Sequence, residues 1–148
     1  MQMLFFKKNK RILVCAGAAV VLLFTLLFWA SKNQAPKIDV SEVLRSCQEN
    51  AAAAYLEFAG YLEEPTEAQY RNGFASLYAC DSQMQLLPAE SREQLPVLEV
   101  HTVVCKIIVQ DQPLSNAAVE MLMKGLEIFQ EDPMSAAAKV YFFQAVNT

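Results

Sequence analysis

The fold is decided by residues 40–87, which read VSEVLRSCQENAAAAYLEFAGYLEEPTEAQYRNGFASLYACDSQMQLL. Apolar residues recur here at steps of three and four in two runs, 40–62 and 67–87. Because an α-helix turns once every ~3.6 residues, that spacing places the apolar residues of each run on a single stripe. The stretch therefore predicts two amphipathic helices joined by a short turn.

Both of these helices carry a start signal. Asp39 with Glu42, and Thr66 with Gln69, match a capping box. In that pattern a short polar side chain accepts a hydrogen bond from the first turn, and an acid or amide three residues later reaches back. Pro65 lies between the two runs, where it ends the first helix. Since the connection is short, we expect the helices to be antiparallel neighbours.

The hairpin brings particular residues together, because positions at equal distances from the turn face each other. Phe58 then faces Tyr70, and Cys47 faces Cys80. A disulfide between Cys47 and Cys80 needs Cα atoms about 4.4–6.8 Å apart, whereas the axes of packed helices are about 8–10 Å apart. We predict that the two cysteines are close. The sequence leaves open whether they form a disulfide or a pair of buried free thiols.

Three further helices are expected after this hairpin. The weakest signal is at 90–109, where Pro96 interrupts the pattern and the β-branched residues of 97–109 also suit a strand. With no strand partner nearby, we favour a helix. A fourth helix is expected over 114–129, and a fifth begins at Asp132, which a proline follows. The predicted fold is all-α, a small antiparallel bundle of about five helices. A solenoid of helical repeats is a weaker alternative.

The last two helices are expected to pack closely around their turn. Met121 then faces Tyr141, and Gly125 faces Ala137. Two small residues opposite each other would let the backbones approach. The predicted inner face of the fifth helix consists of Ala137, Val140, Tyr141 and Ala145.

Three aromatic residues fall outside the predicted inner faces. They are Tyr61 on the first helix and the adjacent Phe142 and Phe143 on the last. An exposed apolar patch often marks a contact with another protein, so these three residues are candidate partner contacts. The alternative is that they are buried against a third helix.

The N-terminal part of the chain has a different character. Residues 12–30, ILVCAGAAVVLLFTLLFWA, contain no charged residue. At about 1.5 Å per residue they span about 28 Å as a helix, close to a hydrocarbon core of about 30 Å. The preceding residues 1–11 carry four cations and no acid, which favours a cytoplasmic location. We therefore predict a transmembrane signal-anchor at 12–30, preceded by a basic cytoplasmic segment. A cleaved signal peptide is the alternative.

The rest of the chain is expected to lie outside the cytoplasm, at the plasma membrane. A polar linker over 31–38 leads into a helical domain over 39–148. Residues 32–148 contain eight Lys or Arg and sixteen Asp or Glu, a net charge of −8. Nucleic acids and anionic lipid surfaces attract basic proteins, so this charge argues against both as ligands of the domain.

No motif predicts an enzyme, a cofactor or a metal site. The only histidine, His101, lies one helical turn before Cys105, with Glu99 nearby. A thiol-dependent enzyme would need such a pair with an orienting acid, but no cation cluster beside Cys105 favours a thiolate. The cysteines are too far apart in sequence to seed a zinc site.

The sequence thus favours a membrane-anchored, non-enzymatic helical module that binds another envelope or membrane protein. Two alternatives remain open. One is an auxiliary subunit that acts through its transmembrane helix within a larger membrane complex. The other is a small thiol-dependent enzyme using Cys105 and His101.

Overall fold

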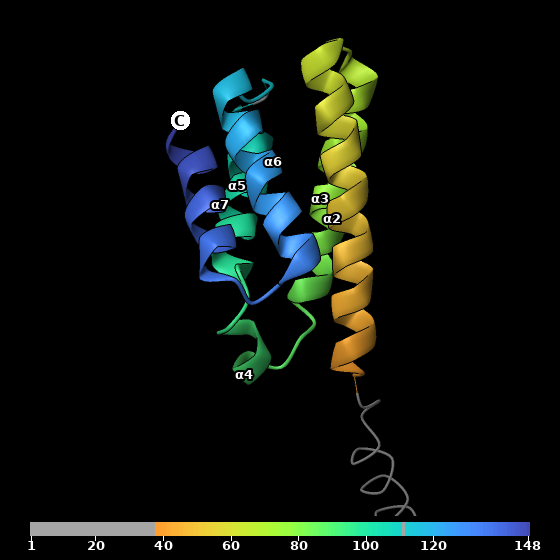
Figure 1. The fold of residues 1–148 in the computed structure, drawn as a ribbon, viewed down its shortest axis with the longest axis vertical. Coiled ribbons are helices and arrows are strands. Elements are labelled where there is room, and N and C mark those ends of the chain that lie inside the picture. The colour runs from red at the N-terminus through yellow and green to blue at the C-terminus, as the bar shows by residue number, and fades with distance from the viewer. Residues whose placement is uncertain (1–37, 111) are drawn as a thin grey trace, which may run out of the picture. The chain divides into compact units, whose positions relative to one another are not determined.

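The computed structural model describes residues 38–110 and 112–148, and Ile38–Thr148 forms one compact unit. The described residues contain six helices and no strand (Figure 1). The helices are α2 (Val40–Glu63), α3 (Glu67–Met84), α4 (Ala89–Arg92), α5 (Val97–Gln110), α6 (Asn116–Glu131) and α7 (Ala136–Asn147). The predicted all-α class and helical bundle are confirmed for this part of the chain.

The predicted basic segment at 1–11, the transmembrane helix at 12–30 and the linker up to residue 37 lie outside the described residues. Among α2 to α7, no helix combines the length and apolar character needed to cross a bilayer.

The structure confirms the predicted hairpin of α2 and α3, both in the residues at which the helices begin and in the residues that face each other. The Asp39 carboxylate accepts a hydrogen bond from Ser41 N at 3.0 Å, and the Thr66 hydroxyl accepts one from Gln69 N at 3.3 Å. These contacts satisfy amides of the first turn that have no partner within the helix. The two rings of Phe58 and Tyr70 meet edge to face, with centroids 5.7 Å apart.

Five helices form a closed ring around the core. In order of contact they are α2, α3, α5, α7 and α6, and α6 returns to α2. The contact between α2 and α6 joins the first hairpin to the last, which a linear stack of repeats would hold apart. This closure argues against the solenoid alternative.

One pair of neighbours in the ring is parallel, contrary to the predicted antiparallel packing. Lys139 near the start of α7 donates to the Glu93 carbonyl just before α5, whereas Lys106 near the end of α5 donates to the Val146 carbonyl at the end of α7. The two helices therefore run in the same direction (Figure 1). The reason lies in the number of helices, because a closed ring of five cannot alternate in direction throughout.

The region 90–109 is helical, as favoured over the strand alternative, but it forms two helices. The short α4 ends at Arg92, and Pro96 immediately precedes α5. Proline is tolerated at a helix start because the amide it lacks would have no partner there. The structure therefore has six helices in its described part, where about five were expected.

The start predicted for the last helix is wrong, and of its predicted inner face only Ala145 is fully buried. Asp132 is the C-cap of α6, and its carboxylate accepts a hydrogen bond from Met134 N in the turn, so α7 begins only at Ala136. The later start rotates the face that meets the core. Its buried residues are Ala138, Phe142 and Ala145, while Ala137 and Val140 are exposed.

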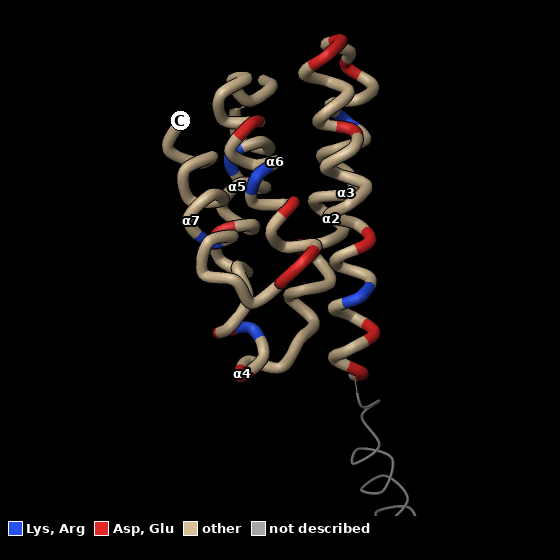
Figure 2. Tube along the Cα trace, in the orientation of Figure 1, with Lys and Arg blue, Asp and Glu red and all other residues tan. Residues whose placement is uncertain are grey.

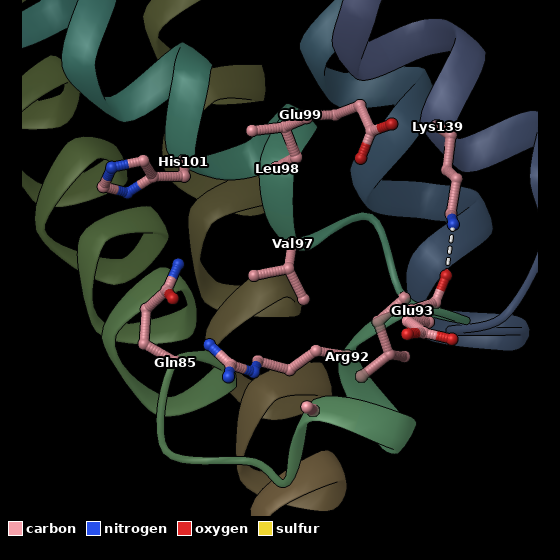
Figure 3. A pocket seen from close by; sticks show the side chains of 10 residues that line it. Gln85, Arg92, Glu93, Val97, Leu98, Glu99, His101 and Lys139 are labelled. Carbon is pink, nitrogen blue, oxygen red and sulfur yellow. Dashed lines mark hydrogen bonds between the residues drawn. The ribbon is translucent and has the colours of Figure 1, made fainter.

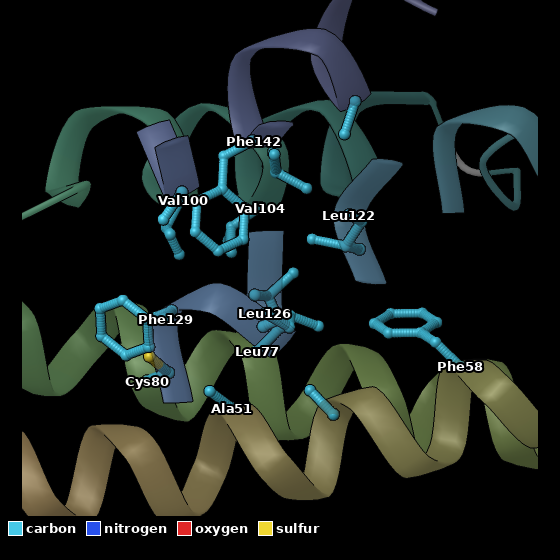
Figure 4. Packing of buried hydrophobic residues seen from close by; sticks show 14 of the residues in the cluster. Ala51, Phe58, Leu77, Cys80, Val100, Val104, Leu122, Leu126, Phe129 and Phe142 are labelled. Carbon is cyan, nitrogen blue, oxygen red and sulfur yellow. The ribbon is translucent and has the colours of Figure 1, made fainter. Parts of the chain in front are cut away.

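The core lies inside the ring and receives side chains from every long helix. Figure 4 shows Phe58 and Ala51 from α2, Leu77 and Cys80 from α3, Val100 and Val104 from α5, Leu122, Leu126 and Phe129 from α6, and Phe142 from α7. Tyr70 also links α3 to the connection before α6, because its hydroxyl accepts a hydrogen bond from Leu114 N at 2.9 Å. Burial raises the pKa of this Tyr70 phenol.

Candidate functional site

The helix α5 is apolar on both of its faces. Nine of its fourteen residues are apolar, and five of these are buried in the core. The other four point outward: Leu98, Cys105, Ile108 and Val109. Leu98 is 73% exposed and Val109 is 82% exposed. A surface helix normally carries polar residues on its outer face, so this outer face of α5 is a candidate binding surface.

Few residues along α5 are charged (Figure 2). The only cation of the helix, Lys106, is turned toward α7 and donates to the carbonyls of Val146 at 2.6 Å and Ala145 at 3.4 Å. Its only acid, Glu99, is partly buried. On the neighbouring α7, Phe143 is 64% exposed. The outer face of α5 is thus largely apolar, with His101 and Thr102 among its exposed polar residues, and the neighbouring α7 exposes an aromatic ring.

A chain of three polar side chains crosses one edge of α5. The carboxylate of Asp81 on α3 lies 2.9 Å from His101 Nδ1, and His101 Nε2 lies 3.5 Å from Cys105 Sγ. Asp81 is 3% exposed and is the only buried charged residue in the described part of the chain. Its other carboxylate oxygen accepts a hydrogen bond from Gln85 Nε2 at 3.3 Å. The imidazole is therefore held between a buried carboxylate and an exposed thiol.

The sequence predicted part of this cluster and missed the rest. His101 and Cys105 share a helix face, as their spacing suggested, but the acid beside His101 is Asp81 and not Glu99. Asp81 stands twenty positions earlier on another helix, so only the α3–α5 packing reveals the contact. One available signal was its position next to Cys80, on the edge of the apolar stripe of α3.

An open pocket of about 570 Å³ lies beside His101, between α4 and the first turns of α5 (Figure 3). Arg92 and Lys139 contribute cations to its wall, and Glu93 and Glu99 contribute acids. Lys139 Nζ donates to the Glu93 carbonyl at 3.0 Å, and Arg92 Nε is buried without a hydrogen-bond partner. Because both signs of charge line the pocket, it does not select ligands of one charge.

Cys47 and Cys80 are close together, as predicted, and both are buried free thiols in this structure. Cys47 Sγ donates a hydrogen bond to the Cys80 carbonyl at 3.7 Å. The interaction with Cys47 and the burial of the site raise the pKa of the Cys80 thiol. Of the two alternatives that the sequence left open, this structure has the buried free thiols, and the disulfide alternative concerns the oxidised protein.

The three aromatic residues predicted to contact a partner have different environments. Phe143 is exposed, whereas Tyr61 is partly buried and its ring packs on Tyr70 with centroids 5.2 Å apart. Phe142 is fully buried, so its prediction as a surface contact is wrong. The later start of α7 turns this ring inward onto Gly125.

Within residues 38–110 and 112–148, no cluster of three or more His, Cys, Asp or Glu side chains converges as metal ligands would. No protein-family model, curated protein or solved structure matches the chain. The outer face of α5 and the Asp81–His101–Cys105 cluster are therefore the candidate functional features of the described domain.

Proposed function

We propose that the chain is a membrane-tethered, non-enzymatic helical module that binds another envelope or membrane protein through the outer face of α5. The observation that carries this proposal is the exposure of Leu98, Ile108 and Val109 on the most apolar helix of the described bundle. Exposed apolar residues in one place on a soluble domain mark protein contacts more often than scattered single ones do.

The chemistry of this face favours an apolar protein surface as the partner. Its one cation, Lys106, is already bound to carbonyls at the end of α7, so the outer face of α5 offers no free positive charge to a phosphate. The acidic balance of the domain likewise disfavours nucleic acid and anionic lipid. The exposed ring of Phe143 adds the kind of residue that is enriched at protein interfaces.

Site-specific photocrosslinking tests the proposal in native membranes. A photoreactive phenylalanine derivative replaces Leu98 or Val109 in the full-length chain, and the same derivative at Leu56 on α2 is the control. Leu56 is 69% exposed, close to the 73% of Leu98, so the two sites differ in location and not in accessibility. We expect the α5 positions to form one discrete adduct with a second protein, and Leu56 to form none.

Two variants check that the adduct depends on the face itself. Val109→Glu should abolish the adduct formed from position 98, because an apolar contact does not accommodate an unpaired carboxylate. Leu56→Glu should leave that adduct unchanged. Both variants should fold normally, since exposed substitutions usually change stability by less than about 0.5 kcal/mol. Adducts equally strong from all positions would overturn the proposal, and an adduct of twice the chain mass would identify a second copy instead.

A further inference from the structure

The three-residue cluster at the edge of α5 has a defined order. Asp81 is buried, and a buried carboxylate without a hydrogen-bond partner would be destabilising. It accepts a hydrogen bond from His101 Nδ1 at 2.9 Å and thereby fixes the orientation of the imidazole. In the neutral ring with its hydrogen on Nδ1, the other ring nitrogen is an acceptor. That acceptor, Nε2, faces Cys105 Sγ at 3.5 Å.

The cluster has the geometry of a proton relay and not of a metal site. Metal ligands converge on one point, but Asp81 and Cys105 contact opposite nitrogens of the same imidazole. The same order of acid, histidine and nucleophile prepares a thiol for attack in proteins, because the histidine takes the thiol proton and the acid holds the ring in place.

Cys105 also occupies a different environment from the other cysteines of the bundle. Cys47 and Cys80 are buried between α2 and α3, whereas Cys105 is exposed on the outer face of α5, between Leu98 and Val109. An unpaired exposed cysteine in an extracytoplasmic protein indicates a reactive thiol or pairing with another chain. Here it lies within the surface that we propose binds a partner.

We propose that Cys105 is a nucleophilic thiol that undergoes thiol–disulfide exchange with a disulfide of the bound partner protein. His101 accepts and returns the proton, and Asp81 is the positioning residue. The identity of the substrate as a partner protein rests on the proposed function above. The reactivity of the thiol toward a disulfide rests on the cluster alone.

The exchange is balanced without a further reactant. The proton of Cys105 moves to His101 Nε2, and the thiolate attacks one sulfur of the partner's disulfide. A bond forms between Cys105 Sγ and that sulfur while the partner's sulfur–sulfur bond breaks. The leaving thiolate takes the proton from His101 Nε2. One disulfide is consumed and one is formed, and a thiol of the partner can reverse the reaction.

The first test measures the rate at which Cys105 reacts with dithiodipyridine, a small uncharged disulfide, in the full-length protein at pH 7. The reaction of a Cys105→Ser chain is subtracted to remove the other cysteines. We expect His101→Gln to slow the reaction about three- to tenfold. An ordinary thiol is only about 3% ionised at pH 7, and the gain from ionisation is partly offset because a more acidic thiolate is a weaker nucleophile.

The matched control is Thr102→Ala, on the same exposed helix face and one turn before Cys105. The Thr102 hydroxyl donates to the Leu98 carbonyl and takes no part in the cluster. This variant should react within about twofold of the parent chain. If His101→Gln also reacts within twofold, Cys105 is an ordinary surface thiol and the proposal is wrong.

The role of Asp81 is tested by nitrogen NMR of the imidazole, which is unambiguous because the chain has a single histidine. We expect the Nδ1–H tautomer in the parent and a shift toward Nε2–H in Asp81→Asn, with a slower reaction of Cys105. Cys105→Ser should keep the Nδ1–H tautomer. A parent in the Nε2–H form would overturn the relay, even if Asp81→Asn does not fold.

The last test separates this inference from the proposed function. Non-reducing electrophoresis of native membranes should show an adduct that reductant releases and that Cys105→Ser abolishes. The photocrosslink from position 98 should persist in Cys105→Ser. A retained photocrosslink without any reducible adduct would refute the exchange while the docking proposal stands. If the parent chain forms neither the photocrosslink nor the reducible adduct, the docking proposal is refuted. The rate of reaction with dithiodipyridine then tests the reactivity of the Cys105 thiol independently of any partner.

Discussion

Gly125 and Gly60 both lie within helices, but their surroundings differ. A Cβ atom added to Gly125 would lie 2.9 Å from Cδ1 of Phe142, a fully buried aromatic ring. A Cβ added to Gly60 would lie 2.7 Å from Nε2 of Gln69, the far end of a flexible side chain. The absence of a side chain is therefore required at Gly125 and only incidental at Gly60.

This difference predicts opposite effects for the same substitution. Replacement of glycine by alanine inside a helix gains about 1 kcal/mol from helix propensity, whereas overpacking a core costs about 1–3 kcal/mol. We expect Gly125→Ala to lower the free energy of unfolding by about 1 kcal/mol and Gly60→Ala to leave it unchanged or raise it by up to about 1 kcal/mol. Denaturant unfolding of both variants measures the difference, and equal effects would show that Phe142 does not limit the space.

The sequence predicted that the last two helices approach closely at Gly125, but it did not predict which residue packs against that glycine. Small size and stripe position were enough to place Gly125 in the interface between the last two helices. The partner is Phe142 and not Ala137, because the turn is longer than expected and shifts the facing positions. The Asp81–His101 contact could not be predicted for a similar reason. It depends on how α3 and α5 pack, and no local sequence pattern indicates it.

At the scale of helices, the capping signals predicted the boundaries well where the cap residue makes its hydrogen bond. Asp39 and Thr66 start α2 and α3 at the predicted positions. Asp132 resembles a cap in sequence but ends α6 and stabilises a turn, because its carboxylate accepts from Met134 N. Three consecutive alanines at the start of α7 give no periodic signal that would have corrected the register.

Two serines at helix starts make this distinction testable. Ser115 caps α6, and its hydroxyl accepts a hydrogen bond from Ala118 N at 3.1 Å. Ser135 occupies the same position before α7 but makes no such side-chain bond. Ser115→Ala should lower the free energy of unfolding by about 0.5–2 kcal/mol, since it leaves an amide of the first turn without its partner. Ser135→Ala should change it by less than about 0.5 kcal/mol.

Thermal or denaturant unfolding measures the free energy of unfolding of the two serine variants, and each variant is the control for the other. A loss of equal size from both variants would mean that the hydroxyl of Ser135 also caps its helix in solution. No loss from either would mean that the bond from Ala118 N is replaced by water at no cost.

At the scale of the whole described domain, the ring explains the placement of Lys106. A ring of five helices contains at least one parallel pair, and here the parallel pair is α5 and α7. The carbonyl ends of two parallel helices lie at the same end of the bundle, where their partial negative charges repel. Lys106 reaches from α5 to the Ala145 and Val146 carbonyls and offsets this repulsion at the end of α7. The cation is thereby removed from the outer face, which stays apolar.

The remaining prediction concerns the whole chain and its orientation in the membrane. We predict that residues 39–148 face the outside of the cell, because the four cations of residues 1–11 precede the uncharged run 12–30. Cys105 offers a direct probe, since it is exposed on a bundle whose other two cysteines, Cys47 and Cys80, are buried.

Intact cells are first treated briefly with a membrane-impermeant reductant, which frees Cys105 from any mixed disulfide, and then with a membrane-impermeant maleimide. We expect the maleimide to label the parent chain and not Cys105→Ser, because the reagent reaches the thiol only from outside. The mass of the labelled chain should include residues 1–30, since the apolar run is predicted to remain as an anchor. Labelling that requires permeabilised cells would place the domain in the cytoplasm. A labelled chain that begins after residue 30 would show instead that the run is a cleaved signal peptide.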